Sequence, residues 1–319
     1  MAARARGCSD RTRTHSECSS SHSTLSVNTS LLRNMSAATT GNLSPGVSYS
    51  YMRSGSTLAT SLFAGHGIFM HHDHTASLAW EHMWEESRRG RCIVIATVRN
   101  PFAQWASLAY MRIVELGKAA FTPGSVATNG TLLAAISTFL RNGLQHCNCS
   151  LPLHMRRTKY GPKLRAFNRC SFDKKRYEFC NTAFWSKNFN AVTGHDVLRV
   201  APEIRQTGHA LLRERPPQKP CSALVLRYED HDRWVGWVCD ALRELDRDFV
   251  CHFDAERTHH QRISAADDVL NNYNWSDSEL QLGISSEHMH FYTPAERLGF
   301  LSQLTSPAAK HAMKMSMPT

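Results

Sequence analysis

The sequence predicts an α/β fold, a three-layer sandwich in which helices cover a mainly parallel central sheet. Two apolar runs, at 92–98 and 222–227, have the length and β-branched content of strands buried on both faces. A third stretch, ending near Tyr51, alternates apolar and polar residues and is typical of a half-buried strand. A helical pattern follows each of them, and strands that alternate with helices favour a parallel sheet.

Composition indicates one folded domain of ordinary character. The chain has 319 residues, 42% of them hydrophobic, which is enough apolar material for one sizeable core. We assign residues 46–305 to this domain, 1–45 to a disordered or targeting leader rich in Ser and Thr, and 306–319 to a disordered tail. No transmembrane segment is visible, because no apolar run is long enough for a signal peptide or a membrane anchor.

The charge balance favours anionic partners. Lys and Arg number 37 against 27 Asp and Glu, which gives a formal net charge of +10 and a pI near 9.2. The sequence carries no helix-turn-helix, zinc-finger or RNA-binding signature that would place bases. We therefore expect an anionic cofactor or acceptor and no nucleic acid.

The first strand leads into a loop and a helix with the features of an anion site. Residues 53–58 read Arg-Ser-Gly-Ser-Thr-Leu, and the helix that follows carries Leu62 and Phe63 on its apolar face. Backbone N–H groups at a helix start lack intrahelical acceptors and lie at the positive end of the macrodipole, so a phosphate can bind them. The side chains add hydroxyl donors and one guanidinium. A capped turn with an incidental arginine would show the same pattern.

A second strand-to-helix turn follows the strand at 92–98. It reads Arg99, Asn100, Pro101, and the helix beyond it is apolar at helical spacing. Asn100 is a favoured N-cap and Pro101 suits the first helical position. Ser107 lies about two turns into this helix.

These stretches resemble the sulfotransferases that use 3′-phosphoadenosine 5′-phosphosulfate (PAPS). Residues 53–57 look like the 5′-phosphosulfate loop of that family. Residues 98–101, with Ser107, resemble its 3′-phosphate motif, in which an arginine and a serine hold the ribose phosphate. Residues 225–230 are similar to a late strand that ends in Tyr-Glu-Asp. The motifs come in the family's order, and the resemblance covers about 46–116 and 221–250.

The resemblance implies a P-loop-like sulfotransferase fold, PAPS as co-substrate and no metal. The implied reaction transfers the sulfuryl group to a hydroxyl acceptor, for which an anionic glycan and a small metabolite are candidates. An arginine at 53, in place of the lysine of the cytosolic enzymes, is closer to the lumenal, carbohydrate-type branch. The residues implied for the cofactor are Arg53, Ser54, Gly55, Ser56, Thr57, Leu58, Arg99 and Ser107, with Arg53 also catalytic.

Two other functions remain as alternatives. A catalytically inactive, PAPS-fold binding protein would carry the same loops. A phosphotransferase or nucleotide kinase fits less well, because its phosphate loop, Gly-x-x-x-x-Gly-Lys-Ser/Thr, places the cation after the second glycine, whereas here the arginine precedes Gly55 and no Gly-Lys pair follows.

The run His71-His72-Asp73-His74, after a short strand at 68–70, offers candidates for a general base. Neighbouring residues of an extended segment point to opposite faces, so the run does not favour a metal site. The family places a His or Glu near the mouth of the cofactor cleft at this point of the chain. His72 or His74 would suit, with Asp73 holding a tautomer, and Glu81 is the reserve. A polar surface loop is the plainer interpretation.

Residues 145–182 form a basic, cysteine-containing insertion. Nine Lys and Arg stand against two acids between 145 and 180. The insertion is either a solvated, disulfide-stapled segment or a basic groove for an anionic acceptor. A zinc site from its four cysteines does not match the spacing of a standard ribbon.

Cysteines and glycosylation sequons lean towards a Golgi or secretory lumen. Seven of the ten cysteines fall between residues 147 and 251, as expected for disulfides. The sequons are at Asn28, Asn34, Asn42, Asn129, Asn148 and Asn274. The basic, Ser-rich leader also suits organelle import, and the cytoplasm remains an alternative because no signal or anchor is visible. The acceptor and the oligomeric state are not readable from the sequence.

The other elements are predicted from helical periodicity and caps. We expect the Tyr-Glu-Asp at 228–230 to cap the helix that follows it. The predicted helices are at 75–89, 131–144, 183–194, 202–215, 231–245 and 294–304.

Overall fold

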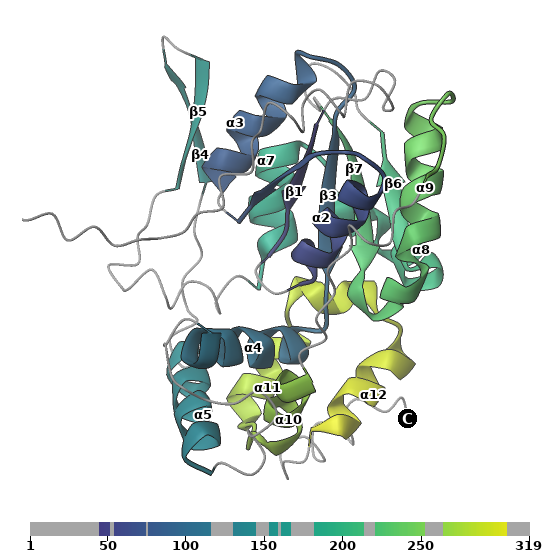
Figure 1. Ribbon diagram of the computed structural model, residues 1–319. Coiled ribbons are helices and arrows are strands. Elements are labelled where there is room, and N and C mark those ends of the chain that lie inside the picture. Colours follow the sequence, from purple (N-terminus) through teal and green to yellow (C-terminus); the bar gives the residue numbers. More distant parts are fainter. Residues whose placement is uncertain are drawn as a thin grey trace, which may run out of the picture.

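The computed structural model describes residues 45–51, 54–74, 76–115, 130–144, 153–158, 161–166, 182–213, 221–252 and 264–304. These residues form an α/β fold with a five-stranded, mostly parallel sheet and helices around it (Figure 1). The predicted leader and tail, together with much of the basic insertion, lie outside the described residues.

The central sheet has the order β2-β1-β3-β7-β6. Its strands are β1 (Gly46–Tyr49), β2 (Met70–Asp73), β3 (Ile93–Val98), β6 (His209–Leu212) and β7 (Ser222–Arg227). All neighbours are parallel except β6, which runs antiparallel to β7. The chain leaves β1 towards β2 on one side and returns to β3 on the other, so the direction of winding reverses between β1 and β3. In open α/β sheets, ligands bind outside the carboxyl ends of the strands at such a switch point.

Helices cover both faces of the sheet because successive residues of β3 alternate between two cores. Ile93 and Ile95 pack with α2 (Ser56–Gly65) and α9 (Trp234–Leu245). Val94 and Ala96 belong to the cluster that includes α3 (Ala76–Ser87), α7 (Asn190–Thr193) and α8 (Ala201–Thr207). This alternation is what a strand buried on both faces requires.

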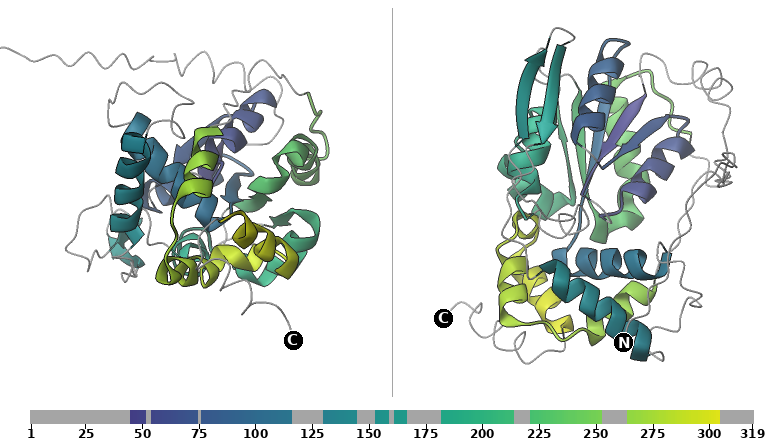
Figure 2. Two further views of the ribbon diagram at one scale, coloured as in Figure 1. Left: turned by 90° about the horizontal axis from the view of Figure 1, so that it is seen from below. Right: turned by 90° about the vertical axis from the view of Figure 1, so that its left-hand side faces the viewer.

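A group of helices lies at the carboxyl edge of the sheet, below it in Figure 1 and also in the right-hand view of Figure 2. It contains α4 (Pro101–Tyr110), α5 (Gly130–Leu144), α10 (Ser264–Asn272), α11 (Asp277–Ile284) and α12 (Pro294–Gln303). β3 leads directly into α4, so the second predicted turn lies between the sheet and this helical group. None of the described helices is long and apolar enough to cross a bilayer.

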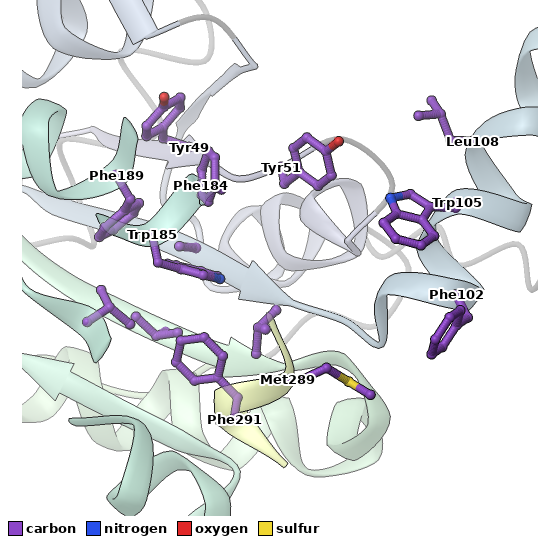
Figure 3. Packing of buried hydrophobic residues seen from close by; sticks show 14 of the residues in the cluster. Tyr49, Tyr51, Phe102, Trp105, Leu108, Phe184, Trp185, Phe189, Met289 and Phe291 are labelled. Atoms are coloured by element: carbon purple, nitrogen blue, oxygen red, sulfur yellow. The ribbon is translucent and has the colours of Figure 1, made fainter. Parts of the chain in front are cut away.

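Aromatic side chains join the end of β1 to the rest of the larger core (Figure 3). The Tyr49 ring stacks on Phe189 with centroids 6.0 Å apart and lies 5.4 Å from Phe184. Both phenylalanines belong to the π-helical turn η2 (Phe184–Phe189). Tyr51 packs on the same group, 5.9 Å from Phe184, so the segment that leads to the first loop is held by buried rings.

The structure confirms the strands predicted at 92–98 and 222–227, the first of which begins at Ile93, and corrects several other elements. β1 is buried on both faces, not half-buried, because α2 and α3 contact it from the two cores on opposite sides of the sheet. The second strand is 70–73, not 68–70, which places His71, His72 and Asp73 inside the strand and His74 directly after it. The helix predicted at 202–215 ends at Thr207, because Gly208 takes φ 83° and the chain turns into β6.

Four further elements were not predicted. A hairpin of β4 (Leu153–Thr158) and β5 (Gly161–Ala166) lies within the basic insertion, and β5 neighbours α3. The helices α10 and α11 lie in a region for which no helix was predicted.

Two disulfides occur among the described residues. Cys239 pairs with Cys251, and Cys221 pairs with Cys92, which joins the starts of β7 and β3. Cys92 was not among the seven cysteines that were expected to form disulfides. Cys147, Cys149, Cys170 and Cys180 lie outside the described residues. Among the sequons, Asn274 is exposed, and the other five asparagines lie outside the described residues.

Candidate functional site

The first loop, between β1 and α2, is bonded to the end of β3. The hydroxyl of Ser54 donates to the carbonyl oxygen of Tyr51 at 2.6 Å and lies 2.7 Å from the hydroxyl of Thr97. The backbone N–H of Thr97 donates to the hydroxyl of Ser50 at 2.9 Å. All of these groups are buried, so they fix the path of the loop relative to the neighbouring strand.

Gly55 begins α2 in a conformation that only glycine adopts readily. Its φ is 107°, and it supplies no side-chain cap to the helix. A Cβ atom at this position would lie 2.4 Å from Cδ2 of Tyr228 and 3.2 Å from the Trp234 ring. The residue therefore allows both the turn and the close approach of the segment after β7. The first N–H groups of α2 meet no side-chain cap within the described residues.

The second loop, between β3 and α4, is satisfied from within the protein. The Asn100 side chain accepts from the N–H of Phe102 at 3.0 Å, and Pro101 has no N–H to offer. Oε1 of Glu229 accepts from the N–H of Asn100 at 2.9 Å. An anion at this loop would have to be bound mainly by side chains, in contrast to the start of α2.

Tyr228 lies between the two loops. The Arg99 guanidinium is 4.4 Å from the centroid of its ring, within the range of a cation–π interaction. The Tyr228 ring also lies against Gly55, where it leaves no space for a Cβ atom. The ends of β1, β3 and β7 thus meet around one aromatic ring.

The predicted cofactor residues have different surroundings. Ser54, Ser56 and Leu58 are buried, whereas Thr57 is exposed at the second position of α2. Ser107 is buried in α4 on the helix that Arg99 precedes. Arg53, the predicted catalytic cation, lies outside the described residues.

Both candidate bases contact the first loop. Nε2 of His72 lies 2.9 Å from the hydroxyl of Ser56, and Nδ1 of His74 lies 3.1 Å from the carbonyl oxygen of Ser50. Their rings meet edge to face with centroids 4.8 Å apart. Desolvation lowers the pKa of His72 to about 4, with a further lowering from His74 and an opposing effect of Asp73, although the residue keeps an exposed surface. His72 is therefore neutral at pH 7.

Asp73 does not hold either candidate in a tautomer, as the sequence had suggested. Its carboxylate lies 2.7 Å from Nδ1 of His82 on α3. His71 contacts Glu86 at 3.2 Å and stacks on His82 with centroids 4.0 Å apart, so this pair of histidines belongs to the β2–α3 contact. The reserve candidate, Glu81, is exposed on α3. No group of three or more metal-ligating side chains occurs among the described residues.

The acidic residues of 228–230 do not cap α9, contrary to expectation. Asp230 pairs with Arg227, and Glu229 reaches across to Asn100 and to Tyr292, whose hydroxyl donates to Oε2 at 2.6 Å. Glu229 keeps an exposed surface, while desolvation raises the pKa of its carboxyl against the effect of these hydrogen bonds and of Arg99. Sequence reasoning missed Tyr292, because no local pattern links residues 63 positions apart.

Chemically, the arrangement offers two loops for anions at the ends of neighbouring strands, with neutral imidazole beside the first and a guanidinium beside the second. Comparisons with protein-family models, with curated proteins and with solved structures found no match.

Proposed function

We propose that this chain is a PAPS-dependent sulfotransferase with a P-loop-like sulfotransferase fold. The observation that carries the proposal is the convergence of the two loops: both follow neighbouring strands at the switch point of the sheet, and both contact Tyr228. A nucleotide with phosphates at its 5′ and 3′ positions requires two anion sites held at a fixed spacing. The sequence motifs that resemble the family fall on these two loops.

The roles follow from the surroundings of each loop. The start of α2, with the hydroxyls of its loop and Arg53, would bind the phosphosulfate, because backbone N–H groups there have no side-chain cap. Arg99 and Ser107 would bind the 3′-phosphate through their side chains. A bound anion beside His72 would raise the pKa of this histidine from about 4 towards neutrality, which improves it as a base.

The proposed reaction is an in-line displacement at sulfur. The acceptor hydroxyl attacks the sulfur atom, its proton passes to the histidine, and the bond between sulfur and the bridging oxygen breaks. Adenosine 3′,5′-bisphosphate leaves with the electron pair. Arg53 and the N–H groups of α2 would stabilise the charge that grows on the bridging oxygen, with no metal needed.

A hydroxyl on an anionic glycan or a small metabolite is the proposed acceptor class, and a secretory lumen is the proposed compartment. The net charge of +10 supports an anionic acceptor, and the two disulfides support an oxidising compartment.

A ligand-dependent melting scan tests the proposal. Adenosine 3′,5′-bisphosphate fills both anion sites, whereas AMP reaches only the first. We expect the bisphosphate at a hundredfold excess over its Kd to stabilise the protein by about 2.7 kcal/mol, a shift of a few degrees, without Mg²⁺. AMP should give a much smaller shift, because it loses charge-assisted bonds worth roughly 1.5–3 kcal/mol each.

The other outcomes separate the alternatives. A larger stabilisation by ATP with Mg²⁺ than by the bisphosphate would indicate a phosphotransferase. Equal stabilisation by AMP and by the bisphosphate would contradict the second anion site. Selective binding of the bisphosphate without turnover of PAPS on any hydroxyl acceptor would indicate a binding protein.

A further inference from the structure

The second loop is tied to the C-terminal part of the chain through one carboxylate. Oε1 of Glu229 accepts from the N–H of Asn100 at 2.9 Å, and Oε2 accepts from the hydroxyl of Tyr292 at 2.6 Å. Asn100 directly follows Arg99, so the first of these bonds holds the residue next to the guanidinium that would bind the 3′-phosphate. The second bond decides where the carboxylate sits.

Tyr292 is itself held rigidly. It is fully buried, and the Arg227 guanidinium lies 5.7 Å from the centroid of its ring. Arg227 pairs with Glu296 at 2.9 Å, and Glu296 also accepts from Thr293 at the start of α12. The position of the Tyr292 hydroxyl is therefore set by the junction of β7 and α12 and not by the loop that it reaches.

We propose that Tyr292 is a positioning residue for the second anion-binding loop. By donating to Glu229, it keeps that carboxylate on the N–H of Asn100 and away from the guanidinium of Arg99. This inference rests on the proposed function, because it concerns how well Arg99 receives the 3′-phosphate.

The physical reason is a competition between anions. Glu229 is close enough for the charge of Arg99 to affect its protonation. Without the Tyr292 hydroxyl, Oε2 of Glu229 loses its hydrogen-bond donor. The nearby Arg99 guanidinium is then the strongest alternative donor. An Arg99 paired with Glu229 binds an incoming phosphate less well, because the internal pair must first be broken. The guanidinium instead lies over the Tyr228 ring, 4.4 Å from its centroid.

The chain contains a matched control for this bond. Tyr273 is also buried, and its hydroxyl donates to a carboxylate oxygen of Glu279 at 2.7 Å. This pair lies in the helical group, where Glu279 caps α11 and Tyr273 packs on Trp275. Removing either hydroxyl costs one buried bond to a carboxylate, but only Tyr292 reaches the Glu229 that contacts Asn100.

The experiment measures the Kd of adenosine 3′,5′-bisphosphate and of AMP for the full chain and its variants. We expect Tyr292→Phe to lower the preference for the bisphosphate about tenfold, the size of one lost charge-assisted hydrogen bond. Tyr273→Phe should leave the preference unchanged. In an Arg99→Ala background, Tyr292→Phe should cause no further loss, because the guanidinium on which it acts is absent.

A second pair of variants keeps the test decisive if Tyr292→Phe does not fold. Glu229→Gln retains an oxygen for the N–H of Asn100 and a polar partner for Tyr292, so it should keep most of the preference. Glu229→Ala removes the carboxylate that would compete for Arg99, so it should also keep the preference, although the lost bond should speed amide exchange of Asn100.

The outcomes separate this inference from the proposed function. A wild-type protein without preference for the bisphosphate would overturn both. A preference that survives Tyr292→Phe, one that is lost in Glu229→Gln or Glu229→Ala, or an equal loss with and without Arg99, would overturn the inference alone.

Discussion

The helices α2 and α4 begin at the ends of neighbouring parallel strands, yet their first turns are completed in different ways. At α4, the Asn100 side chain, the N–H-free Pro101 and the Glu229 carboxylate leave the turn satisfied by the protein itself. At α2, Gly55 provides no side-chain cap. The comparison teaches that the same topological position can lack a side-chain cap on its helix in one case and be completed by side chains in the other.

The two regions also differ in the charge of their neighbours. Imidazoles surround the first loop: His72 and His74 contact it directly, and His288 packs 5.5 Å from the Tyr51 ring. The second loop is held by a carboxylate, Glu229. Burial lowers the pKa of His72 and His288 and raises that of Glu229. Lowering the pH should therefore destabilise the fold through the buried histidines of the first region. Raising the pH should destabilise it through Glu229, because its desolvated carboxyl becomes charged.

The largest expected effect concerns acid stability and His288. This residue is 1% exposed, neither ring nitrogen has a hydrogen-bond partner among the described residues, and burial lowers its pKa to about 3. The unfolded chain takes up the proton near pH 6.5, so stability should fall as the pH drops below that value. We expect the wild type to lose about 3 kcal/mol more than His288→Leu between pH 7 and pH 4. Urea unfolding at both pH values measures this, and equal losses would contradict it.

A somewhat smaller effect is expected from Gly55→Ala, which breaks the uncapped start of α2. The new Cβ meets both an unfavourable φ of 107° and the Tyr228 ring. We expect the protein to lose about 1–3 kcal/mol of unfolding free energy. It should also bind the bisphosphate and AMP poorly, because both would use this loop in the proposed function. Gly236→Ala, on α9 with open space around its Cβ position, is the matched control. A variant that folds and binds like the wild type would show that the turn is not strained.

The smallest expected effect comes from filling the start of α2. Thr57→Asp places a carboxylate at an exposed first-turn position, where it should stabilise the free protein by about 0.3–1 kcal/mol and displace an anionic ligand. The opposite change at α4, Asn100→Ala, should cost about 1 kcal/mol, because that helix depends on its cap. Thermal melts with and without AMP measure both. If Thr57→Asp still binds AMP like the wild type, the start of α2 is not an anion site.

Much of the strand framework could be predicted because its signal is local. The runs at 92–98 and 222–227 are mainly apolar and have the length of strands, as is typical of strands buried on both faces. The loop after β1 and the turn at Asn100 each follow a strand directly, so their place at the carboxyl edge followed from the parallel sheet. The Asn100 cap and Pro101 were correctly predicted from residue type alone.

What could not be predicted depends on partners far away in the chain. The four residues of β6 continue a helical pattern, and they become a strand because Gly208 turns the chain beside β7. Asp73 could have met His72, His74 or His82, and only the packing of α3 on β2 selects His82. The contact of Glu229 with Tyr292 has no periodicity or spacing that would reveal it.

The disulfide between Cys92 and Cys221 acts at a distance from the loops. It joins the starts of β3 and β7, which then pair in parallel from Ile93 opposite Ser222 to Val98 opposite Arg227. A shift of one residue between these strands would turn every side chain to the wrong face and would carry Arg99 away from Tyr228. The disulfide at the start of the two strands thus supports the register that places Arg99 and Tyr228 together at their other end. If the two loops bind one ligand as proposed, the strand register that this crosslink supports would set the spacing between the two phosphate sites.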